Sequence, residues 1–236
     1  MARITAAVSR ERVENLPISV SLGGATKADP SEGAEKTLHK AEDQMYRRKI
    51  YEKNSYHSGL VKLILEALHG KFPAEEAHSK RVARLSEALG RAMGLGQPKI
   101  ERLVAAAAMH DIGKIAVRGE VLEKAGPLDE AEWEEVKRHP DVGYSILGSA
   151  SEYSPLAEVV LAHHESWDGQ GYPRGLKGEG IPFLSRVIAV AGAYDAMVSG
   201  RPYREAMSRE EAVAELRRCA GIQFDPAVVE ALVEKV

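Results

Sequence analysis

The sequence has few features that would place it outside a reducing compartment or in a membrane. Cys219 is the only cysteine among 236 residues, so no intramolecular disulfide can form. No apolar run approaches the roughly 20 residues that a membrane span requires. The first residues, MARITAAVSRERVENLP, lack the apolar segment of a signal peptide. We therefore expect a cytoplasmic protein that does not enter a membrane.

Net charge of one sign is also scarce. The chain has 32 basic and 35 acidic side chains, and its formal net charge of -3 does not attract DNA, RNA or an acidic membrane surface. An anionic ligand would need a local cluster of donors. The hydrophobic share of 44% is typical of globular proteins, and the length suffices for one large domain, or for a full domain with a smaller one.

Only the beginning of the chain has α/β character. Apolar residues alternate with polar ones in PISVSLGGA (17–25), which predicts a short strand. Asp29, Pro30 and Glu32 then predict the start of a helix that runs into the fifties.

From about residue 58 onward, apolar spacing of three and four residues predicts one helix after another. Gly70 and Gly94 are expected to end two of them, and Pro98 to begin a third. Further starts are predicted at Asp129 with Glu132, Ser154 before Pro155, Ser208 with Glu211, and Asp225 before Pro226. The predicted fold is mostly α, a helical bundle with a small N-terminal α/β fragment.

A glycine-rich segment interrupts these helices. Residues 166–182, SWDGQGYPRGLKGEGIP, contain five glycines and two prolines. Loops of this length within a compact domain are usually functional or disordered, and the density of turn residues favours a long ordered loop.

Five histidines fall at or near apolar helix faces: His78, His110, His139, His163 and His164. Any one of them alone reads more simply as a buried or capping histidine with its partners satisfied. The set indicates a metal centre. Neighbouring imidazoles at 163 and 164 point about 100° apart on a helix and enter one polar centre from different directions, which suits more than one metal.

The stretch AMHDIGK (108–114) repeats this arrangement with an acid in the second position. A carboxylate can bridge two cations, whereas a neutral imidazole cannot, so Asp111 is the expected shared ligand. Imidazole with carboxylate suits iron, manganese or zinc rather than calcium, and the lack of thiolates argues against a structural zinc site. We expect two divalent cations, with iron or manganese ahead of zinc.

The order of AHSKRV, MHDIGK, RHP, HHESWDGQGYP and YDAM…RPYR resembles the HD-GYP branch of the HD metal-dependent phosphohydrolase superfamily. The resemblance covers roughly residues 58–236, and its HHE…WDG…GYP run is far more specific than HD alone. It implies an HD-GYP domain over residues 57–236 that hydrolyses a cyclic dinucleotide, cyclic di-GMP, at a centre of two or three metals.

The resemblance also implies roles for individual positions. The implied metal ligands are His78, His110, Asp111, His139, His163 and His164. Asp111 and Lys114 are the implied catalytic residues, with Lys114 on the scissile phosphate. The implied substrate contacts are Lys114, Asp195, Arg201, Arg204, Gly171, Tyr172 and Pro173. A guanidinium fork suits phosphate, although a solvated helix end explains the two arginines as well.

Two positions depart from the family's pattern. In VAGAYDAMVSG, Gly192 stands where the family usually has an aspartate that binds metal, three residues before Asp195. One cation would then need water, a nearby acid or the substrate phosphate as a replacement ligand. Ala74 stands four residues before His78, where three-metal members carry an acid, so we expect at most two metals.

Residues 1–56 resemble the C-terminal end of a GGDEF diguanylate cyclase domain in ISVSLGGAT and AEDQMYRRKIYEKN. The nucleotide-binding and signature segments of that domain are not in this sequence, so we expect a truncated fragment without cyclase activity. Its helix, continuing toward Tyr56, is a candidate for homodimerisation, and a plain connecting helix explains the same residues.

In the enzyme interpretation, two cations about 3.5–4 Å apart activate a water for in-line attack on phosphorus. Lys114 and the two arginines would balance the phosphate charge. Tyr172 is a candidate for stacking on a guanine and Trp167 for a pocket wall, although both would also fit a small loop core. Two other functions stay open: a degenerate receptor that binds cyclic di-GMP or a partner protein, and a phosphohydrolase of other nucleotides.

Overall fold

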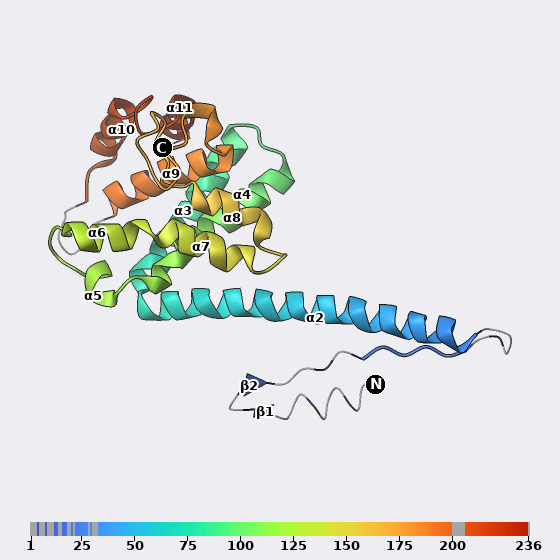
Figure 1. The fold of residues 1–236 in the computed structure, drawn as a ribbon. Helices are drawn as coiled ribbons and strands as arrows, with labels where there is room; N and C mark the ends of the chain where they lie inside the picture. Colours follow the sequence, from blue (N-terminus) through green and yellow to red (C-terminus); the bar gives the residue numbers. More distant parts are fainter. Residues whose placement is uncertain are drawn as a thin grey trace. The chain divides into compact units, whose positions relative to one another are not determined.

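The computed structural model describes residues 33–199 and 206–235, together with residues 4, 8, 12–13, 16–17, 20, 22–27 and 29. The chain divides into two compact units, Met1–Gly59 and Leu60–Val236 (Figure 1). None of the described helices combines the length and the apolar character that a bilayer crossing requires.

Before its long helix, the described part of the first unit contains one short pair of strands. Strands β1 (Arg12–Val13) and β2 (Leu16–Pro17) form a short antiparallel pair. The strand predicted over 17–25 is wrong for residues 20 and 22–25, which have no regular structure. A strand needs a neighbouring strand to satisfy its backbone N–H and C=O groups. Among the described residues β1 is the available partner, and it pairs only with Leu16–Pro17.

One long helix replaces the two that the sequence predicted on either side of residue 57. Helix α2 (Ala34–Lys71) begins after the predicted Asp29 cap and continues past Gly59. A single glycine costs a helix interior only about 1 kcal/mol relative to alanine, which is too little by itself to end a helix. The helix ends just before Pro73, the first residue of the next helix. The GGDEF-like origin of residues 1–56 and dimerisation through this helix stay predictions.

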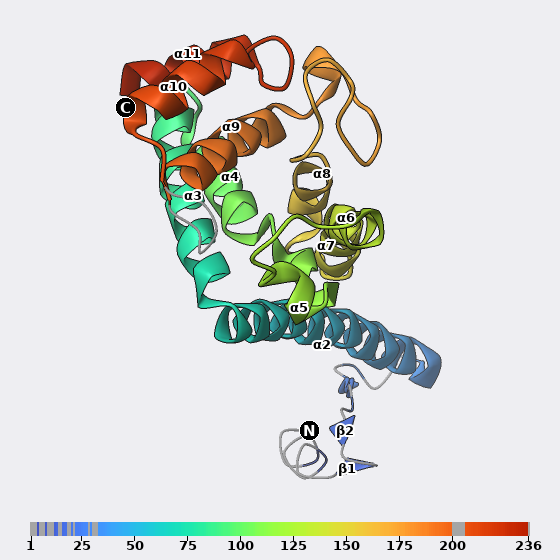
Figure 2. The same ribbon diagram turned by 90° about the vertical axis from the view of Figure 1, so that its left-hand side faces the viewer.

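The second unit is a bundle of helices, as the sequence predicted. Its elements are α3 (Pro73–Ala92), α4 (Gln97–Met109), η1 (Ile112–Ala116), α5 (Gly119–Leu122), α6 (Glu130–Lys137), α7 (His139–Gly148), α8 (Ser154–Leu161), η2 (Gly178–Gly180), α9 (Phe183–Val198), α10 (Arg209–Arg218) and α11 (Pro226–Lys235). Helix α3 packs against α4 and α9, and α7 packs against α8 and η1 (Figure 2). The mostly α fold is confirmed.

One hydrophobic core joins these helices. Leu89 of α3, Leu103 of α4, Val160 of α8 and Ile188 of α9 are all buried within it. Burial of one such side chain contributes about 1.5–3 kcal/mol, so the core fixes where the polar ends of these helices meet.

Two of the predicted helix starts are full capping boxes. The Asp129 side chain accepts from the Glu132 backbone N–H, and the Glu132 side chain accepts from the Asp129 N–H. Ser208 and Glu211 form the same reciprocal pair at the start of α10. These local signals could be read from the sequence because a capping box involves residues only three positions apart.

Candidate metal centre

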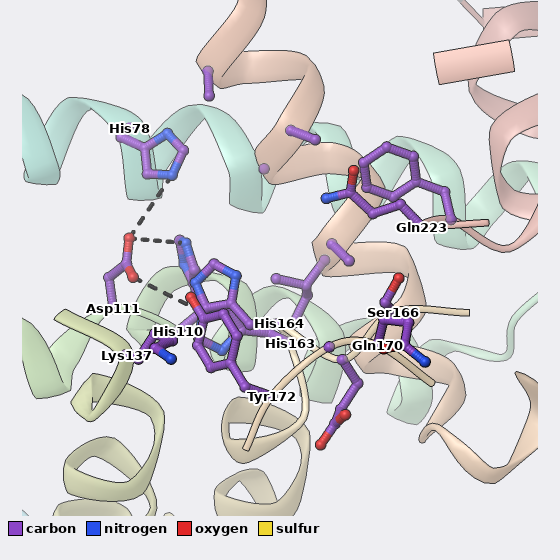
Figure 3. A pocket seen from close by; sticks show the side chains of 18 of the residues that line it. His78, His110, Asp111, Lys137, His163, His164, Ser166, Gln170, Tyr172 and Gln223 are labelled. Atoms are coloured by element: carbon purple, nitrogen blue, oxygen red, sulfur yellow. Dashed lines mark ion pairs between the residues drawn. The ribbon is translucent and has the colours of Figure 1, made fainter. Parts of the chain in front are cut away.

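The predicted metal ligands lie at the ends of helices that the core brings together. His110 caps the C-terminus of α4, Asp111 precedes η1, and His139 is the first residue of α7. His78 projects from α3, while His163 and His164 follow α8. Figure 3 shows five of these side chains, those of His78, His110, Asp111, His163 and His164, gathered at one end of a pocket. The buried apolar residues of α4, such as Leu103 and Ala107, anchor this helix in the core, so its C-terminal end with His110 lies at the pocket.

A close approach between η1 and α7 fixes this convergence. A Cβ on Gly113 would lie 1.9 Å from the His139 carbonyl oxygen and 2.6 Å from the Gly143 backbone nitrogen. Only glycine permits such proximity, because neither backbone atom can move aside cheaply. The packing sets the distance between Asp111 and His139, which lie in different segments.

The Asp111 carboxylate has histidines on both of its oxygens. Its Oδ1 lies 3.2 Å from His139 Nε2 and 3.9 Å from His163 Nε2. Its Oδ2 lies 3.1 Å from His110 Nε2 and 3.8 Å from His78 Nε2. Two groups of potential ligands follow, each with ligand atoms within 4.8 Å of one another: Asp111, His139, His163 and His164; and His78, His110 and Asp111. Asp111 belongs to both groups.

Three of the histidines are held in the tautomer that binds metal. His110, His139 and His163 each donate from Nδ1 to the backbone carbonyl three residues earlier. The acceptors are Ala107, Val136 and Val160, at 2.7, 2.7 and 2.5 Å. A carbonyl oxygen only accepts, so Nδ1 carries a proton, and Nε2 is the ring atom that can coordinate a cation when the ring is neutral. These Nε2 atoms face Asp111.

The residues present fit a divalent cation. His139 Nε2 and His163 Nε2 lie 3.3 Å apart, and in these tautomers each presents a lone pair to the other. A cation between them replaces this repulsion with two ligand bonds. Burial, with the rings of His164 and His110 nearby, holds the pKa of His163 well below its usual value. The ring is therefore neutral at pH 7, which is the form that coordinates metal.

The chain matches one protein family over most of this unit. The family described as the HD domain matches residues 62–228, which is more than half of the chain. The chain belongs to the HD domain family. The HD-GYP assignment made from the motifs is confirmed by this match together with the relatives below.

Several curated relatives share this HD domain. A cyclic di-GMP phosphodiesterase of Thermotoga maritima is 42% identical over 161 residues, which are 66% of this chain and 43% of the relative. The cyclic di-GMP phosphodiesterase response regulator RpfG of Xanthomonas campestris is 42% identical over 158 residues, 66% of this chain and 42% of the relative. A 3'3'-cGAMP-specific phosphodiesterase 3 of Vibrio cholerae is 36% identical over 179 residues, 76% of this chain and 39% of the relative. The chain thus spans less than half the length of these relatives.

A solved structure shares the fold. Bd1817, an HDG"Y"P protein from Bdellovibrio bacteriovorus, aligns with a TM-score of 0.57 over 88% of this chain and 74% of its own. The sequence identity is 18%, so this similarity concerns the fold alone.

Within the HD domain, Lys114 joins the predicted metal ligand Asp111 to Glu75, an acid to which the motifs assign no role. Its Nζ lies 2.9 Å from Asp111 Oδ2 and 2.8 Å from Glu75 Oε2. Burial alone would lower the pKa of Lys114, but the two carboxylates raise it above its usual value. Burial alone would raise the pKa of Asp111, but His110 and Lys114 hold it well below its usual value. Lysine and aspartate are therefore both charged at pH 7.

The signal for Glu75 was its spacing. It lies three residues before His78, so both project from one face of α3. Ala74, the position that matches the family's third-metal acid, is exposed, whereas Glu75 is partly buried.

Asp195 lies behind His78 rather than on the pocket surface. Its Oδ2 is 2.7 Å from His78 Nδ1, and Arg81 donates to both of its oxygens, at 2.5 and 2.9 Å. Burial alone would raise the pKa of Asp195, but His78 and Arg81 lower it to about 2. The carboxylate therefore orients the His78 ring, as carboxylates that accept from the other ring nitrogen of metal-binding histidines do. The family resemblance implied a nucleotide contact for Asp195, which stays a prediction. The contact with His78 could not be read from the sequence, because the two residues are far apart along the chain.

Helix α9 contributes no carboxylate to the pocket lining. Gly192 lines the pocket, and no atom lies within 4 Å of a Cβ built on it. The other residues of α9 that line the pocket are apolar: Ile188, Ala189, Ala193 and Ala196. An aspartate at 192 would therefore meet open space in the pocket that His78 and His110 also line.

The pocket has a volume of about 800 Å³ and extends from the histidines to the glycine-rich loop. Tyr172 lines it, stacked on His164 with ring centroids 4.9 Å apart, and meets Trp133 edge-on at 6.2 Å. Trp167 is not among the lining residues; the Arg186 guanidinium lies 5.6 Å from its ring centroid. The loop-core interpretation therefore holds for Trp167.

Other predicted substrate contacts have different outcomes. Gly171 lines the pocket, whereas Pro173 is not among its lining residues. Arg201 and Arg204 lie outside the described residues, so their contact with phosphate stays a prediction. The pocket also has lining side chains that the sequence analysis did not select, namely Trp133, Lys137, Gln170, Gln223 and Phe224.

Glu165 holds the glycine-rich loop in place. Its buried carboxylate accepts from the backbone N–H of Arg174 at 2.7 Å and of Leu176 at 2.9 Å. A Cβ on Gly171 would lie 2.1 Å from the Ser166 nitrogen, so the loop folds tightly back on the residues after His164. The only sequence signal for this role was the acid that directly follows the two histidines.

Replacing Glu165 with glutamine should loosen this loop. The amide NH2 would face a backbone N–H, and leaving one buried donor unsatisfied costs about 1–3 kcal/mol. We expect a matching loss in the free energy of unfolding, measured by urea denaturation, and faster hydrogen exchange at Arg174 and Leu176. Glu179→Gln, at an exposed position of the same loop, is the control and should change neither. Equal exchange in both variants would contradict this role.

Proposed function

We propose that the HD domain of this chain hydrolyses a phosphodiester bond of cyclic di-GMP at a binuclear metal centre. The observation that carries the proposal is the Asp111 carboxylate, whose two oxygens face two different groups of histidines. A shared carboxylate between imidazole groups is the arrangement that a two-metal phosphodiesterase needs. The relatives named as cyclic di-GMP phosphodiesterases support the choice of substrate.

Each group of residues would hold one cation. Asp111 with His139, His163 and His164 would hold the first, and Asp111 with His78 and His110 the second. We propose iron or manganese, which accept imidazole and carboxylate ligands together. Bound cations would neutralise phosphate charge and lower the pKa of a water toward neutrality.

The protein's own residues would position the substrate. The Lys114 ammonium lies beside Asp111 and keeps its charge, so it can donate to a nonbridging phosphate oxygen. His164 is the exposed member of the histidine set, and Tyr172 covers one face of its ring, which restricts how water and nucleotide reach the centre. Trp133, 45% exposed on α6 and lining the pocket, offers an aromatic surface to a base.

Hydrolysis by the purified chain reconstituted with Mn²⁺ or Fe²⁺ tests the proposal. Cyclic di-GMP should be converted to linear dinucleotide or mononucleotide, resolved by chromatography, and 3'3'-cGAMP serves as the competing substrate. Faster cleavage of 3'3'-cGAMP would overturn the choice of cyclic di-GMP. Tight binding of cyclic di-GMP without cleavage by the metal-loaded protein would instead support the receptor function, which the absence of a carboxylate at Gly192 favours.

Replacing Gly192 with aspartate should increase turnover. The added carboxylate would meet open space in the pocket that His78 and His110 line, and would give the group of His78, His110 and Asp111 a fourth ligand. We expect a gain of about 10-fold or more, since even outer-shell changes alter metal affinity or activity by 10–100-fold. Gly192→Asn is the matched control, because it has the same shape without the charge. If the parent already equals the aspartate variant, the idea of an impaired centre is wrong.

A further inference from the structure

The two groups of ligands around Asp111 differ in how complete they are. Asp111 Oδ1 faces the group with three histidines, His139, His163 and His164. This group therefore offers a cation four protein ligands. Asp111 Oδ2 faces the group with two histidines, His78 and His110. This second group has three ligands, and α9 opposite it adds only apolar residues to the pocket wall.

Lys114 already forms an ion pair with Asp111 Oδ2, the oxygen that faces the smaller group. Lys114 Nζ lies 2.9 Å from Asp111 Oδ2, the same oxygen that lies 3.1 Å from His110 Nε2. Among the described residues no lysine or arginine is paired with Oδ1. A divalent cation in the smaller group would therefore meet a buried ammonium on its shared ligand, whereas a cation in the larger group would not.

Lys114 has a second partner to move toward. Glu75 Oε2 lies 2.8 Å from its Nζ on the side of α3, and both side chains are largely buried. The ammonium can leave Asp111 and remain paired. An incoming phosphate would favour this movement, since it supplies oxygens to the ammonium and to the cation at once.

We infer that the centre fills in two unequal steps. The group Asp111, His139, His163 and His164, here called the closed subsite, binds one cation in the free protein. The group His78, His110 and Asp111, here called the open subsite, binds its cation together with a phosphate that completes its ligands and draws Lys114 away. The identity of that phosphate as the substrate's rests on the proposed function, whereas the order of filling does not.

A consequence is that the second cation and the phosphate strengthen each other's binding. Binding free energies of two ligands are coupled reciprocally, so a phosphate that tightens the cation is itself tightened by it. Hydrolysis would then respond to the supply of free metal at concentrations that leave the closed subsite saturated.

Titration of the metal-free full chain with Mn²⁺, followed by electron paramagnetic resonance and calorimetry, tests the order of filling. Without phosphate we expect one tight cation per chain and a second that binds much more weakly. Inorganic phosphate should tighten the second by about 5–150-fold and leave the first unchanged. Two equal dissociation constants, or a second one that phosphate does not alter, would overturn the inference.

Substitutions at Lys114 and Glu75 test whether the second cation is weakened by the Lys114 ammonium or only by the smaller number of ligands. Lys114→Met removes the charge and should tighten the second cation in the absence of phosphate. Glu75→Gln removes the negative charge of the alternative partner, favours Lys114 on Asp111, and should weaken the second cation. An unchanged second constant in both variants would eliminate the role of Lys114. If Lys114→Met does not fold, His78→Ala and His164→Ala decide instead, because the former should remove only the weak cation and the latter should remove the tight one.

The same preparations distinguish this inference from the proposed function. Ordered filling without cleavage of cyclic di-GMP would overturn the hydrolytic function and leave the inference standing. Cleavage with two equally tight cations would do the reverse.

Discussion

Replacing Asp111 with asparagine should remove metal binding from both subsites and abolish hydrolysis. Asparagine keeps the shape of the side chain, but its amide NH2 cannot bind a cation, and its carbonyl lacks the charge that faces His139 and His110. We expect the metal content to fall from the parent's value toward zero. Turnover should fall by about 100–1,000-fold or more, the range for losing one preorganised electrostatic contact. Elemental analysis and the chromatographic assay measure the two effects.

Asp141→Asn is the matched control for this substitution. Asp141 is exposed in the first turn of α7 and makes no contact with the histidines among the described residues. Metal content and turnover should equal those of the parent. An Asp111→Asn protein that kept both cations would show that the two groups of histidines do not share this carboxylate.

Replacing Gly113 with alanine should damage both stability and the metal centre. The added Cβ would lie 1.9 Å from the His139 carbonyl oxygen, so η1 and α7 would have to separate. Overpacking of this kind costs about 1–3 kcal/mol in the free energy of unfolding. The separation would also move Asp111 relative to His139, so the tight cation should weaken. Chemical denaturation and Mn²⁺ titration give the two quantities.

Gly148→Ala is the control for the alanine effect itself. Gly148 ends α7, and no atom lies within 4 Å of a Cβ built on it. Its free energy of unfolding should be unchanged or raised by up to about 1 kcal/mol, because alanine loses less chain entropy than glycine on folding. A Gly113→Ala protein as stable as this control, with the parent's metal affinity, would contradict the close packing of η1 on α7.

Much of the second unit could be predicted because its signals are local. The capping boxes at Asp129 and Ser208 depend on residues three positions apart, and apolar spacing identified the successive helices. The histidines and Asp111 were selected for the chemistry of their side chains, and the structure brings them together.

The predictions that failed depended on context beyond the local sequence. Two helices were predicted on either side of residue 57, but α2 runs through this position, and the one glycine there, Gly59, costs too little to end a helix. The strand over 17–25 required a partner strand that local alternation cannot supply. The contact of Asp195 with His78 was not predicted, because it joins α9 to α3 across a long stretch of chain.

The sequence by itself determined which side chains carry the chemistry. The types and spacings of His110, Asp111 and Lys114 are local properties, and so is the absence of a carboxylate at Gly192. Only the tertiary structure decided how these groups divide between the two oxygens of Asp111, and that Glu75 shares Lys114. Those relations are distances between segments remote in the sequence, and the packing of α3, α4, α7 and α8 around one core sets them.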